Sequence, residues 1–413
     1  MTAEDSFVIV GASLAGAKAA ETLRGEGFDG RIVLVGAEHH LPYERPPLSK
    51  GYLAGSAERS SLFVHADEWY AEHHVELRLG VSATDLDVTA HEVALSDGST
   101  LGYDKLLLAT GSSPRRLDVT GAELDGVLYL RTIDDSERLR SSITADTRVV
   151  VVGAGWIGLE TAAAARGAGA QVTVLEAAAL PLLRVLGDEV APVFAALHRA
   201  HGVDLRLGVG VDHLRPSDPD GAQVGAVVLS DGSDVPADIV VVGVGVTPNV
   251  QLAEAAGLTV DNGIVVDEHL RSSDPDVYAA GDVANAYHPF LGRHIRVEHW
   301  ANALNQPVPA ARSMLGGEAA YDRLPYFYTD QYDLGMEYTG YVDPGGFDQV
   351  VIRGDTDTRE FVAFWLSSGR VLAGMNVNVW DVTDPIKALI LSRRAVDPVR
   401  LADPSVPLTD LLD

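Results

Sequence analysis

The sequence contains no cysteine among its 413 residues. Disulfide scaffolds, thiolate-ligated zinc or iron–sulfur centres, cysteine nucleophiles and redox dithiols are therefore excluded. Basic residues are also scarce: 31 lysines and arginines stand against 59 aspartates and glutamates, which gives a net charge of −28. A chain this acidic is not expected to bind nucleic acid or anionic lipid through its overall electrostatic field.

Long apolar runs are missing as well. The longest one, at residues 149–159, is interrupted by glycines, and none approaches the roughly 20 apolar residues that span a bilayer. The N-terminal segment carries two acidic residues before its first apolar run, unlike a secretory signal. We therefore expect a cytoplasmic protein without membrane association, folded as about two to three domains.

Glycine, in contrast, is abundant and marks a pattern that occurs twice. Residues 7–38 and 148–177 each contain a β-branched run, a glycine-rich turn, an alanine-rich helical stretch, a second β-branched run and an acidic residue. This order is typical of a βαβ unit that binds a dinucleotide. Two such units in one chain predict two dinucleotide sites, one for a flavin and one for a nicotinamide.

The residues of each turn have separate roles. Gly11 and Gly153 allow the tight bend out of the strand, and Gly155 lets the backbone approach a pyrophosphate. The helix N-terminus then offers free N–H groups and the positive end of its dipole. In the first copy Ser13 takes the place of the middle glycine. The candidate binding residues are Gly11, Ser13, Leu14, Ala15 and Gly16 in the first turn, and Gly153, Gly155, Trp156, Ile157 and Gly158 in the second.

An acidic residue ends the second strand of each copy. Glu38 and Glu176 are placed where a carboxylate accepts hydrogen bonds from a ribose diol. Glu176 also predicts a preference for NAD(H) over NADP(H), because a carboxylate repels a 2′-phosphate and the next cation along the chain is Arg184.

Three further segments end apolar strands in glycine turns. Residues 106–114 and 240–249 are expected to be paired crossovers that leave and re-enter the first domain. Residues 272–284 end in Gly281–Asp282, where the carboxylate can accept bonds from ribityl hydroxyls and helix N–H groups can face phosphates.

The motifs GASLAG, YERPPLSK, ATG, GAGWIGLE, GVGVTPN and AAGDVA occur in this order. Their sequence resembles the FAD- and NADH-dependent ferredoxin reductases that serve bacterial cytochrome P450s and ring-hydroxylating oxygenases, from Phe7 to at least Gly374. The resemblance implies an α/β, two-dinucleotide-binding, glutathione-reductase-like fold. It also implies a split FAD domain at 1–114 and 248–327, an NAD domain at 115–247 and a C-terminal α/β domain at 328–413, with a late helix near residues 385–394.

The resemblance also implies site residues. Lys50 corresponds to the lysine near flavin N5, and Glu160 to its partner glutamate beside the nicotinamide. The implied FAD set is Gly11, Ser13, Leu14, Ala15, Gly16, Glu38, Arg45, Lys50, Val81, Ala109, Thr110, Gly111, Arg131, Gly281, Asp282, Glu298, His299 and Trp300. The implied NAD set is Gly153, Gly155, Trp156, Ile157, Gly158, Glu160, Glu176, Arg184, Gly243, Val244 and Gly245.

Two features depart from the family pattern. Pro307 and Pro309 fall where the family continues a helix, and a proline inside a helix removes a hydrogen bond. We therefore expect the helix to start late or to kink there, which affects the contacts of Trp300 and Gln306. Tyr328 stands where the family has tryptophan, which would alter flavin packing or partner contact.

The expected reaction is electron transfer from NADH through FAD to an iron–sulfur ferredoxin, since the absent cysteines exclude thiol chemistry. An NADH:quinone or NADH:oxygen oxidoreductase and a redox-dependent signalling flavoprotein are the alternatives. No metal site is expected. A ferredoxin is usually acidic, so docking requires a local basic patch; the candidates are Arg293, Arg296, Arg312, Lys387, Arg393 and Arg394.

Overall fold

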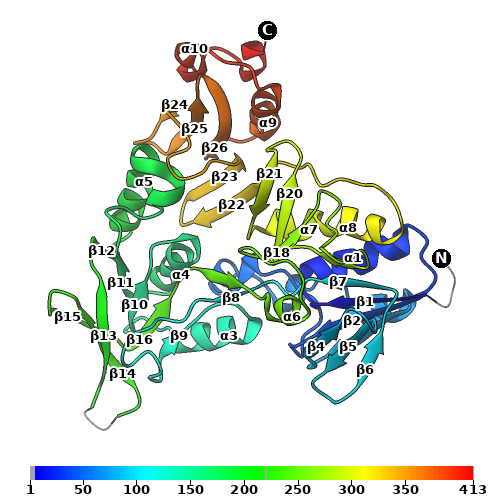
Figure 1. Ribbon diagram of the computed structural model, residues 1–413. Coiled ribbons are helices and arrows are strands. Elements are labelled where there is room, and N and C mark those ends of the chain that lie inside the picture. Colours follow the sequence, from blue (N-terminus) through cyan, green and yellow to red (C-terminus); the bar gives the residue numbers. More distant parts are fainter. Residues whose placement is uncertain (1–4, 219–220, 413) are drawn as a thin grey trace. The chain divides into compact units, whose positions relative to one another are not determined.

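The computed structural model describes residues 5–218 and 221–412, which form two compact units (Figure 1). The first unit comprises the described residues up to Arg45 together with Arg59–Ser113 and Val246–Pro325. The second comprises Pro46–Glu58, Pro114–Gly245 and the described residues from Tyr326 onward. Residues 1–4, 219–220 and 413, which include the outer ends of the expected FAD and C-terminal domains, lie outside the described residues.

A five-stranded parallel sheet of order β19-β7-β1-β2-β3 forms the centre of the first unit. Its inner strands β7, β1 and β2 are β-branched or leucine-rich runs that are almost wholly buried, as parallel sheets require, whereas the edge strand β3 is mostly only partly buried. The helices and strands of this unit are β1 (Ser6–Val10), α1 (Leu14–Gly25), β2 (Arg31–Gly36), η2 (Arg59–Leu62), α2 (Asp67–Glu72), β3 (Val75–Leu79), β4 (Ala83–Asp87), β5 (Glu92–Leu95), β6 (Thr100–Gly102), β7 (Lys105–Leu108), β8 (Ser112–Pro114), β17 (Val246–Pro248), α6 (Gln251–Ala255), β18 (Ile264–Val266), β19 (Val277–Ala279), β20 (Ala284–His288), β21 (Arg293–Arg296), α7 (Trp300–Asn305) and α8 (Pro307–Met314).

The second unit repeats this plan with a parallel sheet of order β12-β11-β10-β16-β9. In both sheets the first strand of the repeat has the second strand on one side and a later strand on the other. Ligands of such sheets bind at this switch point, beyond the carboxyl ends of the strands. The elements are η1 (Pro46–Ser49), β9 (Val127–Leu128), α3 (Ile133–Ser142), β10 (Arg148–Val152), α4 (Trp156–Gly167), β11 (Gln171–Glu176), α5 (Leu183–Ala200), β12 (Asp204–Leu207), β13 (Val211–Pro216), β14 (Val224–Leu229), β15 (Asp234–Pro236) and β16 (Ile239–Val242).

The C-terminal part of the second unit is an antiparallel sheet of order β22-β23-β26-β25-β24. One apolar core runs from the parallel sheet into this sheet and includes Trp365, Phe361 and Phe194. The elements are β22 (Tyr326–Gln331), β23 (Leu334–Gly340), β24 (Gln349–Asp355), β25 (Glu360–Ser367), β26 (Arg370–Val377), α9 (Thr383–Ser392), α10 (Pro398–Ala402) and η3 (Leu408–Leu411). The α/β fold with two dinucleotide-binding halves is therefore confirmed.

The helix expected around Pro307 is interrupted. α7 ends at Asn305, and α8 begins with Pro307 in its first turn, where a missing N–H costs nothing. Gln306, between the two helices, accepts a hydrogen bond from Gly281 N–H through its side-chain oxygen at 2.9 Å. The crossovers at 106–114 and 240–249 pair as β8 and β17. Among residues 5–218 and 221–412, no helix is long and apolar enough to cross a membrane.

Candidate dinucleotide-binding sites

The first turn is shaped by two glycines that the chain itself requires. Gly11 has φ +125°, and a Cβ there would overlap the carbonyl oxygen of Ala109, at the switch point between β1 and β7. A Cβ on Gly16 would overlap the carbonyl oxygen of Gly11. Both positions therefore exclude a side chain for reasons of backbone geometry.

The second turn contains a glycine that the protein does not require. Gly153 has φ +100° and faces Gly243, and a Cβ on Gly158 would overlap Gly153. Gly155 has an ordinary φ of −79°, and a Cβ added there would lie no closer than 4.0 Å to any heavy atom. The missing side chain therefore leaves room for a ligand, which fits a pyrophosphate approaching the backbone.

Both helices that follow the turns present uncapped N-termini. Neither Ser13 before α1 nor Gly155 before α4 makes a side-chain cap bond. The Ser13 hydroxyl instead donates to the Tyr43 carbonyl oxygen at 3.4 Å. The first N–H groups of each helix therefore remain available to phosphate oxygens.

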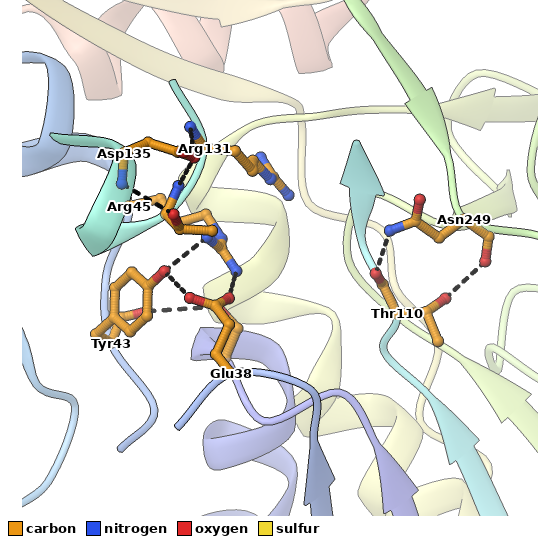
Figure 2. Close-up of polar contacts among 9 residues, drawn as sticks. Glu38, Tyr43, Arg45, Thr110, Arg131, Asp135 and Asn249 are labelled. Carbon is orange, nitrogen blue, oxygen red and sulfur yellow. Dashed lines mark hydrogen bonds and ion pairs between the residues drawn. The ribbon is translucent and has the colours of Figure 1, made fainter. Parts of the chain in front are cut away.

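The acidic residue of the first copy is held by side chains (Figure 2). Glu38 Oε2 accepts from the Tyr43 hydroxyl at 2.5 Å, and Glu38 Oε1 accepts from Arg45 Nη2 at 2.8 Å. Burial lowers the pKa of Arg45, but the nearby charges of Tyr43, Glu38 and Asp282 outweigh it and raise that pKa. Two residues of the implied FAD set, Glu38 and Arg45, thus form one ion pair.

The acidic residue of the second copy is held by the backbone. Glu176 Oε2 accepts from Ala154 N–H at 2.7 Å, and Oε1 accepts from Ala178 N–H at 2.8 Å. Glu176 takes part in no ion pair within the described part of the chain. Arg184 lies exposed in the first turn of α5.

A second group of polar residues lies at the carboxyl end of β7 and β19. Asp282 is 9% exposed and accepts a hydrogen bond from the Ser112 hydroxyl at 2.8 Å. Thr110 donates its hydroxyl to the Asn249 carbonyl, and the Asn249 amide donates to the Thr110 carbonyl, both at 2.8 Å (Figure 2). These bonds fix the turns at Thr110 and Asp282, where polar ligand groups are expected.

The segment before α7 brings three implied FAD residues together. Trp300 Nε1 donates to Glu44 Oε2 at 3.1 Å. Burial lowers the pKa of His299 to about 4, despite the opposing charge of Asp282. Glu298 forms an ion pair with Arg296 at 2.5 Å. His299 is therefore neutral near pH 7, so a hydrogen bond from it would come from a neutral ring.

Arg296 was expected to contribute to a docking patch, and the structure argues against this. Its side chain is 8% exposed, and besides Glu298 it bonds to the Asp282 carbonyl and to Asn262. Arg312 and Lys387 are exposed but paired, with Glu26 and Asp384 respectively.

The implied catalytic pair lies within the second unit. Lys50 Nζ is 2.7 Å from Glu160 Oε1, and the two side chains are 15% and 3% exposed. The Lys50 ammonium also lies 5.3 Å from the ring centre of Tyr328, a cation–π contact. Glu160 further accepts hydrogen bonds from Ser49 and Thr329, each at 2.5 Å.

The other expected residues occupy turns. Val81 N–H donates to the Gly36 carbonyl at 3.0 Å, beside the end of β2. Arg131 N–H donates to Asp135 Oδ2 at 3.1 Å, at the start of α3 (Figure 2). Lys50 and Arg131 belong to the second unit, and the rest of the implied FAD set belongs to the first.

Around the second turn, some expected residues face outward and one does not. Ile157 and Val244 are large apolar side chains that are 46% and 39% exposed, as expected of residues that contact a ligand. Trp156 packs instead against Phe194 and Phe327. Its side chain therefore has a packing role and remains partly exposed.

Sequence reasoning missed Tyr43, Ser49 and Thr329. The first two lie inside the YERPPLSK motif, next to the candidate residues Arg45 and Lys50. Thr329 gives only a weak signal, because it is one of three consecutive polar residues that follow the aromatic residues of its strand. No group of three or more potential metal ligands occurs in residues 5–218 and 221–412.

The chain contains two such turns. Each lies at a switch point of its sheet, leads into an uncapped helix N-terminus and is followed by an acidic residue. Together these features define an oxidoreductase that binds two dinucleotides. Residues 5–306 match the family model described as pyridine nucleotide-disulphide oxidoreductase, and residues 326–412 match the one described as reductase C-terminal. The chain belongs to this family.

Individual relatives narrow the comparison. Putidaredoxin reductase CamA of Pseudomonas putida is 41% identical over 415 residues, covering 100% of this chain and 98% of that protein. The ferredoxin–NAD(+) reductase component of the anthranilate 1,2-dioxygenase system of Burkholderia cepacia is 43% identical over 412 residues, 99% of each. The crystal structure of the covalent putidaredoxin reductase–putidaredoxin complex matches with a TM-score of 0.95 at 40% identity, covering 100% of this chain and 99% of that chain.

Family members of this type use FAD and NAD(H). The expected family and cofactor pair are therefore confirmed, and the free space at Gly155 and the uncapped helix N-termini are consistent with dinucleotide binding.

Proposed function

We propose that this protein is an FAD-dependent NADH:ferredoxin oxidoreductase that supplies electrons to a cytochrome P450 or another oxygenase. The observation that carries the proposal is the buried Lys50–Glu160 pair in a chain without cysteine. Relatives of the same fold class that act on disulfides need thiols, whereas this chain has no cysteine, and its Lys50–Glu160 pair supports a flavin site of the kind that the family resemblance implies. Full-length similarity to two ferredoxin reductases supports the acceptor class.

The residues divide by cofactor. The first turn, Glu38, Arg45 and Asp282 hold FAD, and the second turn and Glu176 hold NADH. FAD, when bound, would supply the chemistry that links a two-electron hydride donor to a one-electron acceptor. Lys50 supplies a positive charge and Glu160 keeps it in place. The fixed backbone of both turns orients the two ligands, because hydride transfer depends on close alignment.

The test is anaerobic reduction of the purified holoprotein by NADH, followed by titration with [2Fe–2S], [3Fe–4S] and [4Fe–4S] ferredoxins. We expect bleaching of the flavin absorbance on adding NADH, and its recovery as one type of ferredoxin becomes reduced. Turnover with a quinone or with oxygen, but with no ferredoxin, would instead establish the alternative NADH:quinone or NADH:oxygen oxidoreductase.

We also propose where the ferredoxin docks, how the chain divides into domains and where in the cell the protein acts. With Arg296 buried in an ion pair, the docking candidates are Arg293, Arg312, Lys387, Arg393 and Arg394. Reversing the charge at Lys387 should weaken ferredoxin reduction and leave ferricyanide reduction intact. We propose three domains, with boundaries near residues 114, 247 and 327, and a cytoplasmic location.

A further inference from the structure

Glu160 is a buried carboxylate with an unusual number of donors. Its side chain is 3% exposed, and it accepts from Lys50 Nζ at 2.7 Å and from the hydroxyls of Ser49 and Thr329 at 2.5 Å each. A buried charge is costly unless it is paired and fully hydrogen-bonded. The position of this carboxylate, and of the ammonium it binds, is therefore set by these neighbours.

Thr329 is the inner end of a longer chain of hydrogen bonds. Its single hydroxyl proton goes to Glu160, so the same oxygen must accept from Gln331 Nε2, which lies 3.2 Å away. Gln331 Oε1 is 2.9 Å from His198 Nε2. His198 Nδ1 is in turn 3.5 Å from the Tyr332 hydroxyl.

The donor and the acceptor of every hydrogen bond in this series can be assigned. Gln331 Oε1 can only accept, so His198 carries its proton on Nε2 and offers Nδ1 as an acceptor. Burial lowers the pKa of His198 to about 4, which keeps the ring neutral near pH 7. Burial also raises the pKa of Tyr332 to about 12, so its hydroxyl keeps its proton. The donors thus all point toward Glu160.

The three inner residues of this hydrogen-bond chain are buried and lie on two elements. Thr329 and Gln331 are each 1% exposed and lie two residues apart on β22, so both face the same side. His198 is fully buried on α5. A chain of this kind adds rigidity because each bond orients the next.

We propose that Thr329, Gln331 and His198 are positioning residues that fix the Glu160 carboxylate and, through it, the Lys50 ammonium. This inference rests on the proposed function, because it takes Lys50 as the residue beside the flavin. None of the three residues touches the cofactors under this proposal; each acts through Glu160.

The first test replaces Thr329 with valine, which keeps its shape and removes the hydroxyl. In the holoprotein, we expect the limiting rate of flavin reduction by NADH to fall about tenfold with little change in NADH affinity, since misplacement affects the reacting geometry more than binding. Thr329→Ser restores the hydroxyl and should recover most of the rate. Thr339→Val is the matched control, a buried threonine on the neighbouring strand β23 that lies outside the chain.

A second readout does not depend on activity. The sequence has four lysines, Lys18, Lys50, Lys105 and Lys387. Acetylation by acetic anhydride, measured by mass spectrometry, gives the labelling of Lys50 relative to Lys387. We expect Thr329→Val to raise this ratio at least about threefold, because a loosened side chain opens to solvent more often, and Thr339→Val to leave it unchanged.

The outcomes separate this proposal from the proposed function. The proposal is overturned if Thr329→Val changes neither rate nor labelling ratio by more than twofold, or if Thr339→Val causes the same losses. It also falls if Lys50→Met leaves flavin reduction unchanged while the wild type is reduced normally, a result that leaves the NADH reductase assignment standing. If NADH does not reduce the flavin of the wild type, the proposed function is overturned. The labelling ratio then still decides whether the hydrogen-bond chain positions Lys50.

Discussion

The two dinucleotide turns follow one pattern but hold their acidic residues in different ways. Glu38 is bonded by the Tyr43 hydroxyl and paired with the Arg45 guanidinium. Glu176 is bonded by two backbone N–H groups, and no ion pair involves it in the described part of the chain. The first carboxylate is therefore paired with a side-chain cation, whereas the second is bonded by backbone groups alone among the described residues.

The middle residues of the two turns, Ser13 and Gly155, show the same contrast between side-chain and backbone groups. Ser13 fills the first turn and bonds to the Tyr43 carbonyl. Gly155 leaves the second turn open, with no heavy atom closer than 4.0 Å to a Cβ built there. We infer that side chains form much of the first ligand site. In the second site, the ligand contacts exposed backbone, and the Glu176 carboxylate determines which ligand binds.

The largest expected effect is a difference in stability between alanine substitutions of two glycines in the second turn. Gly153→Ala should destabilise the second unit by about 4 kcal/mol or more, because its φ of +100° disfavours a side chain and the new Cβ would overlap Gly243. Gly155→Ala should cost less than about 1 kcal/mol in stability but weaken NADH binding. Urea unfolding and NADH titration measure both quantities.

These two variants serve as controls for each other, since they make the same chemical change two residues apart. Equal losses of stability would show that the open space at Gly155 is not a property of the folded turn. Unchanged NADH binding in Gly155→Ala would remove that turn from the nicotinamide site.

Local sequence patterns predicted the two turns well, but the sequence alone could not predict contacts between residues far apart in the chain. Gly11 and Gly153 have positive φ values in a turn between strand and helix, so the local motif reveals them, although the backbones they face, at Ala109 and Gly243, lie far away in the sequence. The bond between Thr329 and Glu160 joins residues 169 positions apart, and only the packing of β22 against α4 creates it. Arg296 was mistaken for a surface cation because nothing in a sequence shows that Glu298 and the Asp282 carbonyl enclose it.

Acidification should affect both units. His299 in the first unit and His198 in the second have pKa values lowered by burial to about 4. A histidine that resists protonation when folded takes up its proton on unfolding, so stability is complete above the unfolded pKa and falls as the pH drops from about 6.5 toward 4. Each histidine should contribute a loss of about 3 kcal/mol over this range, measured by urea unfolding between pH 7 and pH 4.5.

His198→Gln distinguishes the units. Its amide N–H can still donate to Gln331, but the side chain no longer titrates. The pH dependence of the second unit should flatten while that of the first persists, which unit-specific hydrogen exchange can follow. An unaltered slope in the second unit would show that another group causes its acid sensitivity.

The carboxylate charge of Glu176 should determine nicotinamide selectivity. Glu176→Gln keeps an acceptor for the ribose diol and removes the charge that repels a 2′-phosphate. We expect the ratio of kcat/KM for NADH to that for NADPH to fall about tenfold to hundredfold, in line with about 1.4–2.7 kcal/mol of electrostatic discrimination. Glu38→Gln is the control and should leave this ratio unchanged, because Glu38 belongs to the other turn; an equal change in both variants would refute the division of roles.

The smallest expected effect comes from exchanging the middle residues of the two turns. Ser13→Gly should leave folding intact and loosen FAD by less than tenfold, because the hydroxyl makes one long bond to Tyr43 at 3.4 Å. Gly155→Ser should weaken NADH more, since its side chain enters the space that the pyrophosphate needs. FAD release by dilution and NADH titration compare the two. If Ser13→Gly is the more damaging change, then the first site depends on its middle residue more than the second does, and the contrast between side-chain and backbone binding is reversed.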